Sequence, residues 1–196
     1  PTAPTREGYT FTSWDVTFDK VTGDITITAQ YEIKTYTVSF EVGEGSTVTS
    51  QSVNHGETAT EPSAPEREGY SFVGWYEDEA LETEFAFDTK ITADTTIYAK
   101  WDVNTYTLAY TAGENGSITG EATQIVEHGN DGTAVTAVAD DGYHFLSWSD
   151  NSTDNPRTDA NVTEDITVVA SFAINEYTVT FVDWDGQVID TQAVSH

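Results

Sequence analysis

The four histidines are the side chains of this sequence best suited to bind a metal ion or to move a proton near neutral pH. His55, His128 and His196 share one repeated position, in V-N-H-G, V-E-H-G and V-S-H, whereas His144 stands outside that pattern. Copies of one position in successive repeats lie too far apart to share a metal, and a turn-forming Gly follows two of them. We therefore predict that these three histidines occupy turns and bind no metal, and that His144 is exposed.

Carboxylates are abundant, but they form no catalytic pattern. The chain has 34 Asp and Glu against 7 Lys and Arg, with a net charge of -27, so paired carboxylates arise by number alone and do not identify a glycosidase. The motifs G-x-S-x-G, the phosphate-binding loop and H-E-x-x-H are absent, and the lack of Cys removes thiolate chemistry. The sequence predicts no catalytic residues and no enzyme activity.

Three acidic loops carry oxygen ligands of the kind that Ca²⁺ prefers. They are residues 183–186, 140–142 and 150–154, and none has the spacing of an EF-hand loop. Asp-Gly is also common in β-turns, which accounts for two of the loops without a ligand. We expect no cofactor and no specific metal site, and weak Ca²⁺ binding by these loops stays an open alternative.

The elements that hold these side chains recur along the chain. Three sequence patterns return in one order at spacings of about 61 to 73 residues. The first is G-Y-x-F-x-x-W. In the second, apolar and polar residues alternate with period 2, and the last residue is aromatic. The third is Y-T-[VL]-x-[FY], in which apolar or aromatic residues also alternate with smaller ones. Alternation of this kind predicts strands with one buried face. Copies of the first pattern are residues 8–14, 69–75 and 142–148. Copies of the second are residues 24–31, 94–101 and 165–172, and copies of the third are residues 36–40, 106–110 and 177–181.

Composition agrees with strands and limits the partners. Thr is abundant and aromatic residues make 12% of the chain, which suits half-buried strands and argues against disorder. The strong negative charge repels nucleic acid and anionic membrane surfaces. No apolar run approaches the roughly 20 residues that span a bilayer. We predict a mainly β chain that binds no nucleic acid and inserts into no membrane.

The repeats divide the chain into four segments. Residues 35–104 and 105–175 form complete modules, residues 1–34 match the C-terminal half of a module, and residues 176–196 match the N-terminal half. Because the chain also lacks Met, we favour a segment cut from a longer array. The alternative is a filament subunit, in which the half-modules of different copies complete each other head to tail by strand exchange.

The first complete module resembles the internalin B-repeat, also called the Listeria-Bacteroides repeat. The residues that carry the resemblance are G-Y-S-F-V-G-W-Y at 69–76, the acidic stretch that follows, and T-I-Y-A-K-W at 96–101. Residues 105–175 are similar to a divergent form, with Phe172 in place of the terminal Trp. The resemblance implies small β-grasp-like (ubiquitin-like) modules in tandem, in secreted or cell-surface bacterial proteins, with no catalytic residues. We expect Tyr70, Phe72 and Trp101 to lie in the module core.

The function that these observations favour is positional. We expect a non-catalytic stalk or spacer of a bacterial cell-surface adhesin, in which neighbouring repeats contact each other and short linkers at residues 102–105 and 173–176 limit bending. A module that binds a glycan or a host protein through exposed aromatic side chains, such as Tyr76 or Trp184, is the other alternative besides the filament subunit.

Overall fold

The structure, a computed structural model, describes all 196 residues and consists of strands and loops without a helix. This confirms the prediction of a mainly β chain. The chain divides into two compact units, Pro1–Asp102 and Val103–His196.

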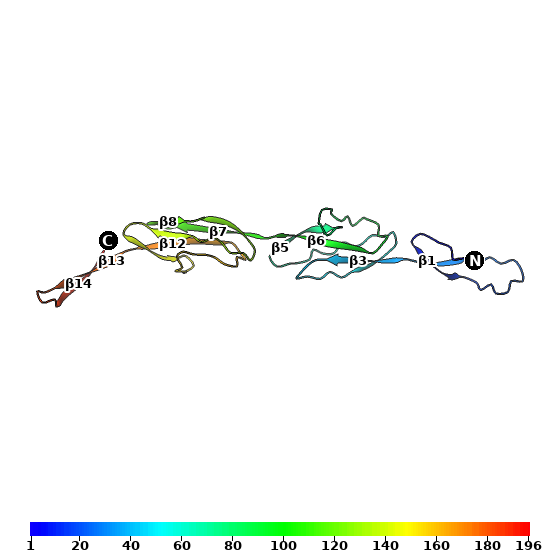
Figure 1. Cartoon of the computed structure of the whole chain (residues 1–196), viewed down its shortest axis with the longest axis horizontal. Helices are drawn as coiled ribbons and strands as arrows, with labels where there is room; N and C mark the ends of the chain where they lie inside the picture. Colours follow the sequence, from blue (N-terminus) through cyan, green and yellow to red (C-terminus); the bar gives the residue numbers. More distant parts are fainter. The chain divides into compact units, whose positions relative to one another are not determined.

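The first unit contains a two-stranded and a four-stranded sheet (Figure 1). Strands β1 (Tyr9–Trp14) and β2 (Ala29–Ile33) form an antiparallel pair. The four-stranded sheet has the order β4-β3-β6-β5, with bounds Thr35–Glu41 for β3, Gln51–Asn54 for β4, Tyr70–Tyr76 for β5 and Thr95–Val103 for β6. Its central strands, β3 and β6, run parallel with Val38 opposite Thr95 and Phe40 opposite Ile97.

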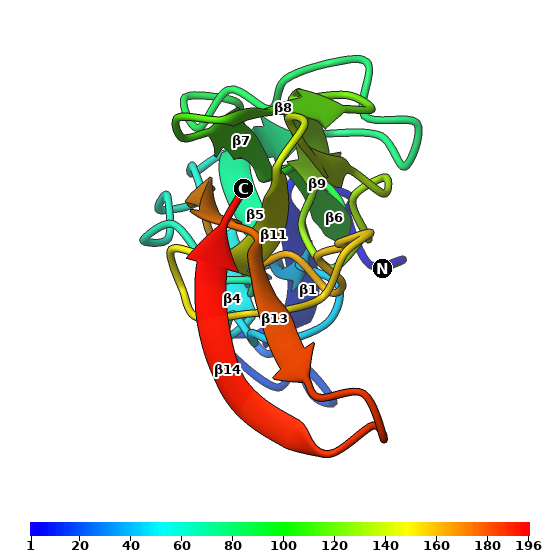
Figure 2. The same cartoon turned by 90° about the vertical axis from the view of Figure 1, so that its left-hand side faces the viewer.

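The second unit repeats this arrangement. Its four-stranded sheet has the order β11-β12-β7-β9, and β7 and β12 are the parallel central pair, with Leu108 opposite Ile166. Strands β8 and β10 add a small sheet, and β13 and β14 form a separate hairpin, visible in Figure 2 as a long curved ribbon. The bounds are Thr105–Ala112 (β7), Gly116–Thr119 (β8), Thr123–Glu127 (β9), Thr136–Ala139 (β10), Tyr143–Trp148 (β11), Ile166–Ile174 (β12), Glu176–Val182 (β13) and Val188–Ser195 (β14).

Each four-stranded sheet has its own apolar core. In the first unit Val38, Phe40, Trp75 and Ile97 are buried, and Phe40 meets Trp75 edge to face with ring centroids 5.2 Å apart. In the second unit Leu108, Tyr110, Trp148 and Val168 occupy the corresponding places. Alternate residues of a strand face one side of a sheet, so the repeated Y-T-[VL]-x-[FY] pattern places its second and third apolar residues in the core.

The expected core aromatics of the first module divide into two groups. Phe72 and Trp101 pack, partly buried, against the core, as predicted. Tyr70 is not in that cluster, and the guanidinium carbon of Arg67 lies 3.8 Å from its ring centroid. The prediction for Tyr70 therefore holds only in part: its side chain is half-buried outside the cluster, with a cation over its ring.

The strand predicted over residues 24–31 forms only in part. Its equivalent in the first sheet, β6, pairs with β3 through Thr95–Tyr98 and continues beside β5. In residues 1–34 strand β2 is the equivalent of β6, and its one partner is β1, the equivalent of β5. Strand β2 therefore starts at Ala29, and residues 25–28 form no strand. An alternating sequence needs a neighbouring strand for its hydrogen bonds, and here that neighbour is absent.

Candidate functional site

A one-residue connection joins β2 to β3 in the first unit. Lys34 is that residue; its N–H donates to the carbonyl of Gly8 (2.8 Å), and its carbonyl accepts the N–H of His55 (2.8 Å). Gly8 has a φ of +73°, and a Cβ at this position would lie 2.1 Å from Cδ2 of the His55 ring. Backbone hydrogen bonds therefore hold Lys34 on both sides. At position 8 only Gly fits beneath the imidazole of His55.

The same arrangement recurs in the second unit, between β12 and β13. The N–H of Asn175 donates to the carbonyl of Gly142 (2.8 Å), and its carbonyl accepts the N–H of His196 (2.9 Å). Gly142 has a φ of +82°, and a Cβ there would lie 2.2 Å from Nδ1 of His196. We call this set of Gly, connecting residue and His the junction.

Two histidines of the repeated position, His55 and His128, occupy turns as predicted, whereas His196 directly follows β14. His55 does stand in a turn, but its ring packs on Gly8 and near the Tyr36 ring, with centroids 5.9 Å apart. His128 and Tyr106 form a similar pair, with centroids also 5.9 Å apart. The repetition of H before G and of G before Y was the available signal, but nothing local in the sequence links the two. His144 is exposed, as predicted, with Nδ1 2.9 Å from Oδ1 of Asn175.

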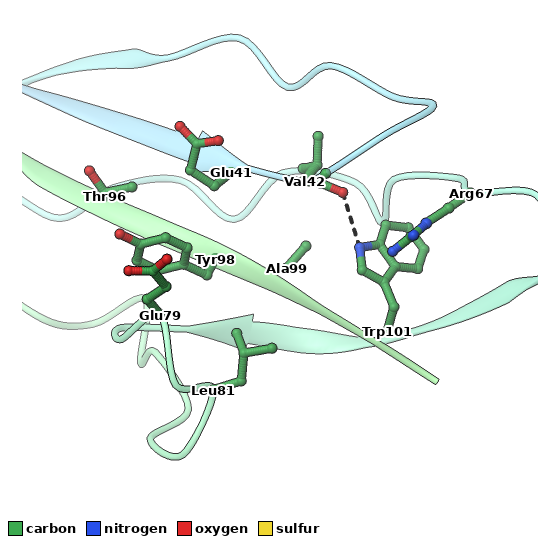
Figure 3. Close-up of a pocket in the computed structure, with 10 residues that line it drawn as sticks. Glu41, Val42, Arg67, Glu79, Leu81, Thr96, Tyr98, Ala99 and Trp101 are labelled. Carbon is green, nitrogen blue, oxygen red and sulfur yellow. Dashed lines mark hydrogen bonds between the residues drawn. The ribbon is translucent and has the colours of Figure 1, made fainter. Parts of the chain in front are cut away.

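A cleft of about 640 Å³ lies in the first unit between the end of β3, strand β6 and the loops on either side of β5 (Figure 3). Arg67 and Trp101 lie at one end of it, and Glu41, Glu79 and Tyr98 are among its other lining residues. Trp101 donates its indole N–H to the carbonyl of Val42 (3.1 Å), so the ring is fixed in place. The cleft thus presents aromatic surface together with charges of both signs, an arrangement that suits a small polar ligand.

The aromatic side chains considered for ligand binding differ in accessibility. Tyr76 is half-buried, and Nζ of Lys100 lies 4.7 Å from its ring centroid while donating to the carbonyl of Leu81 (3.2 Å). Its ring is therefore already engaged by a cation. Trp184, between β13 and β14, is 94% exposed, and neither of the two aromatics lines the cleft.

A buried charged cluster in the second unit was not predicted. Arg157 binds Asp159 through Nε (2.8 Å) and Nη2 (2.6 Å) and Asp150 through Nη1 (2.7 Å), and the Tyr110 hydroxyl donates to Asp159 (2.7 Å). The hydrogen bonds from Arg157 lower the pKa of Asp159, and burial followed by the bond to Asp159 raises the pKa of Tyr110. Arg157 is the only Lys or Arg in the sequence after Lys100. This single cation among acidic loops is the sequence feature that indicates the cluster.

The acidic loops form turns. In residues 183–186 the carboxylate of Asp183 accepts the N–H groups of Asp185 (3.2 Å) and Gln187 (2.9 Å). Tyr143 N–H donates to the carbonyl of Asp140 across the second loop (3.1 Å), and the third contains Asp150, which binds Arg157. No group of three His, Asp or Glu side chains is placed to hold a metal ion.

Comparison with known families decides the identity of the two sheets. Residues 36–100 match the model of the Listeria-Bacteroides repeat domain, and residues 106–176 match that of the divergent InlB B-repeat domain. The chain belongs to the internalin B-repeat family. The first B-repeat holds the cleft, and the second holds the Arg157 cluster.

Several bacterial proteins contain stretches similar to these B-repeats. A provisionally named Gly-rich membrane protein of Evansella cellulosilytica is 34% identical over 193 residues, covering 90% of this chain and 22% of that protein. A second provisionally named membrane protein of that organism is 37% identical over 162 residues, with coverages of 76% and 24%. Internalin H of Listeria monocytogenes is 40% identical over 117 residues, with coverages of 53% and 21%. The chain thus spans less than a quarter of the length of these relatives.

Among solved structures, the chain is similar to Streptococcal High Identity Repeats in Tandem domains 3 and 4 of a cell surface protein. The match has 16% sequence identity and a TM-score of 0.25, and it covers 71% of this chain and 98% of the other.

The chain has no helix with the length and apolar character required to cross a bilayer.

Proposed function

We propose that the chain is a non-catalytic spacer, a stalk segment of a secreted or surface-attached bacterial adhesin. The observation that carries the proposal is the junction: two different places in the chain join successive strands through one residue that is hydrogen-bonded on both sides. A connection this short, fixed by backbone hydrogen bonds and by a Gly-His contact, restricts bending between consecutive modules.

The module boundaries proposed for the stalk are 1–34, 35–104, 105–175 and 176–196. They are supported by the connecting residues, because Lys34, Asn104 and Asn175 each stand alone between two strands. We also propose a β-grasp-like module in which a loop replaces the helix. Support comes from the order β4-β3-β6-β5 with a parallel central pair, and from the helix-free connection between β4 and β5.

The surface charge and the family suit an extracellular location. The relatives include an internalin of Listeria, and the chain carries a net charge of -27, which keeps an extended array soluble and discourages collapse onto itself. The chain also contains no Cys, so its modules rely on their apolar cores instead of disulfides.

Small-angle X-ray scattering on the dilute chain tests the stalk. A compact globule of this length has a radius of gyration of about 16 Å, and we expect a clearly larger value. The double variant Gly8→Ala, Gly142→Ala places a Cβ against both histidines, so its mean radius should fall as the junctions loosen.

The matched control is Gly56→Ala, Gly129→Ala. These glycines have φ values of +80° and +81°, so Ala is equally strained there, but a Cβ has nothing within 4 Å at Gly56 and only an ordinary contact at Gly129. The control should keep the wild-type radius. A wild-type radius near that of a globule, or equal changes in both double variants, would contradict the stalk.

The cleft of the first B-repeat supports a second candidate, binding of a peptide segment of a host protein. Glu41 and Glu79 line the part of the cleft near Tyr98, away from Arg67 and Trp101 (Figure 3), so a Lys or Arg side chain suits that part better than an acidic group. Titration with a lysine-rich peptide, followed by NMR, should shift the indole N–H signal of Trp101, and the variant Glu41→Gln, Glu79→Gln should weaken binding several-fold. Equal weakening by Glu114→Gln, Glu121→Gln, on the exposed surface of the second B-repeat, would show general charge attraction only.

A further inference from the structure

Arg67, at one end of the cleft of the first B-repeat, is a half-buried cation without a carboxylate partner. Both ion pairs of the chain belong to Arg157, so Arg67 forms none, although the chain carries 34 Asp and Glu. Its guanidinium carbon lies 3.8 Å from the ring centroid of Tyr70 instead. Such a contact uses the face of the guanidinium and leaves the N–H groups at its edge free to donate. The ring of Tyr70 therefore holds the cation in place while its donors stay available for an anion.

Trp101 supplies a fixed aromatic surface at the same end of the cleft (Figure 3). Its half-buried ring packs edge to face on Phe72, with ring centroids 5.5 Å apart, and its indole N–H donates to the carbonyl of Val42 (3.1 Å). Because this ring and the guanidinium are already ordered, a ligand loses little affinity to the ordering of side chains. The Arg67 end of the cleft is thus prepared for a group that combines a negative charge with apolar surface.

The other part of the cleft has the opposite charge. Glu41 and Glu79 lie there near Tyr98, and both carboxylates are exposed (Figure 3). A ligand that spans the cleft therefore needs an anionic group at one end and a cationic group at the other. A peptide carries both within a few residues, whereas a polysaccharide of uronic acids supplies only the anion. The charges of the cleft thus favour a peptide, and its volume of about 640 Å³ suits a short segment.

The second B-repeat keeps the backbone of this site but not its charge. In the first B-repeat the N–H of Tyr70 donates to the carbonyl of Arg67 (3.1 Å). In the second, the N–H of Tyr143 donates to the carbonyl of Asp140 at the same distance. An acidic residue thus forms the same turn, so the turn itself does not require Arg67. The corresponding place in the second B-repeat repels an anion, and the site belongs to the first.

We propose that the Arg67 end of the cleft binds a carboxylate of a peptide whose basic side chain lies near Glu41 and Glu79. The carboxylate accepts N–H groups of the guanidinium, and the apolar part of the same peptide residue covers the ring of Trp101. Two sources supply such a group, the side chain of Asp or Glu and the C-terminus of a chain. The inference rests on peptide binding by the cleft, the second candidate function, and is independent of the stalk.

Two pairs of short peptides test the carboxylate separately from the basic side chain. All are N-acetylated and contain one Lys followed by two Gly. In the first pair the chain ends in a free carboxylate or in an amide; in the second an Asp or an Asn precedes a terminal amide. Titration at low salt, followed through the indole N–H signal of Trp101, gives the Kd of each peptide.

We expect the acidic member of at least one pair to bind about tenfold more tightly than its neutral match, because hydrogen bonds between ionised groups are strong. A gain in the Asp pair alone identifies a side chain as the source of the carboxylate. A gain in the pair with the free terminus alone identifies the end of a chain. Either result supports the proposal.

The variant Arg67→Gln should abolish the difference within the pair, and Arg67→Lys should keep part of it, since Lys retains the charge but not the planar set of donors. The matched control is Arg6→Gln. The guanidinium carbon of Arg6 lies 3.9 Å from the ring centroid of Tyr9, so this variant loses the same charge and the same kind of contact, but Arg6 does not line the cleft. It should keep the full difference. An unchanged indole N–H signal of Trp101 in the free variants verifies that the cleft is folded.

Three outcomes overturn the proposal. One is equal affinity of acidic and neutral peptides for the wild type, and another is a difference that persists in Arg67→Gln. The third is tighter binding of an oligosaccharide of glucuronate than of any peptide, which would make the site a glycan site. The variant Glu41→Gln, Glu79→Gln separates these failures from that of the peptide candidate. If it weakens all the peptides while acidic and neutral members bind equally, the cleft binds the basic side chain without a carboxylate; if no peptide binds, both proposals are wrong.

Discussion

At the scale of single residues, the stability of the second B-repeat depends on one cation. The side chain of Arg157 is 8% exposed and binds two carboxylates, and one of them, Asp159, also accepts the hydroxyl of Tyr110. A buried guanidinium is tolerated only while its partners are ionised, since an unpaired buried charge is strongly unfavourable. The cluster therefore ties this repeat to the ionised state of its carboxylates.

We predict that Asp159→Asn lowers the free energy of unfolding of the second B-repeat by about 3 kcal/mol at pH 7. The pKa of Asp159 is lowered below the ordinary 3.8 in the folded state by the hydrogen bonds from Arg157. Its contribution is thus complete above about pH 4 and is lost as the pH falls through the folded pKa. Urea unfolding at pH 7 and pH 3 should show a smaller difference between variant and wild type at the lower pH.

The control is Asp141→Asn, an exposed carboxylate for which no such cluster exists. It should change the free energy of unfolding by less than about 0.5 kcal/mol at either pH. A destabilisation by Asp159→Asn that stays constant from pH 7 to pH 3 would show that shape, and not charge, accounts for the effect.

At the scale of elements, the sequence predicts strands well wherever a partner strand is present. The alternating pattern of residues 94–101 corresponds to most of β6, and the pattern of residues 165–172 to most of β12. The same pattern at residues 24–31 forms a strand only from Ala29 onward. Periodicity describes which face a residue would present, whereas strand formation also needs hydrogen-bonding neighbours that the local sequence does not contain.

The junction and the cluster were harder to foresee than the strands, because both depend on contacts between distant residues. Gly8 and His55 are each conspicuous in the repeats, but only the folded chain shows that one covers the other. Arg157 and Tyr110 are likewise 47 residues apart and meet through Asp159. Side-chain partners of this kind follow from tertiary structure and leave no local periodicity in the sequence.

At the scale of the whole molecule, charge controls how copies of the chain meet. The net charge of -27 opposes any contact between copies, and it acts over about 10 Å at 0.1 M salt. We predict that copies of the chain repel each other more weakly as NaCl is raised from 20 mM to 500 mM, because screening shortens the range of the repulsion between their negative charges. Sedimentation velocity at fixed protein concentration measures this as a rise in the mean sedimentation coefficient.

A mean sedimentation coefficient that falls as salt is added would point instead to attraction between opposite charges, which is the reverse of what the net charge of -27 predicts.

The parallel pairing of β3 with β6 also determines how a B-repeat responds to a pulling force. Strand β3 begins the repeat at Thr35 and β6 ends it at Val103, and the two lie side by side in the same direction. Tension applied through the chain ends therefore slides these strands past each other, so all the hydrogen bonds between them bear the load at once. Strands pulled apart from one end would instead lose their bonds one by one. The second B-repeat has the same geometry in β7 and β12, so each repeat resists extension along the direction in which a tether is stretched.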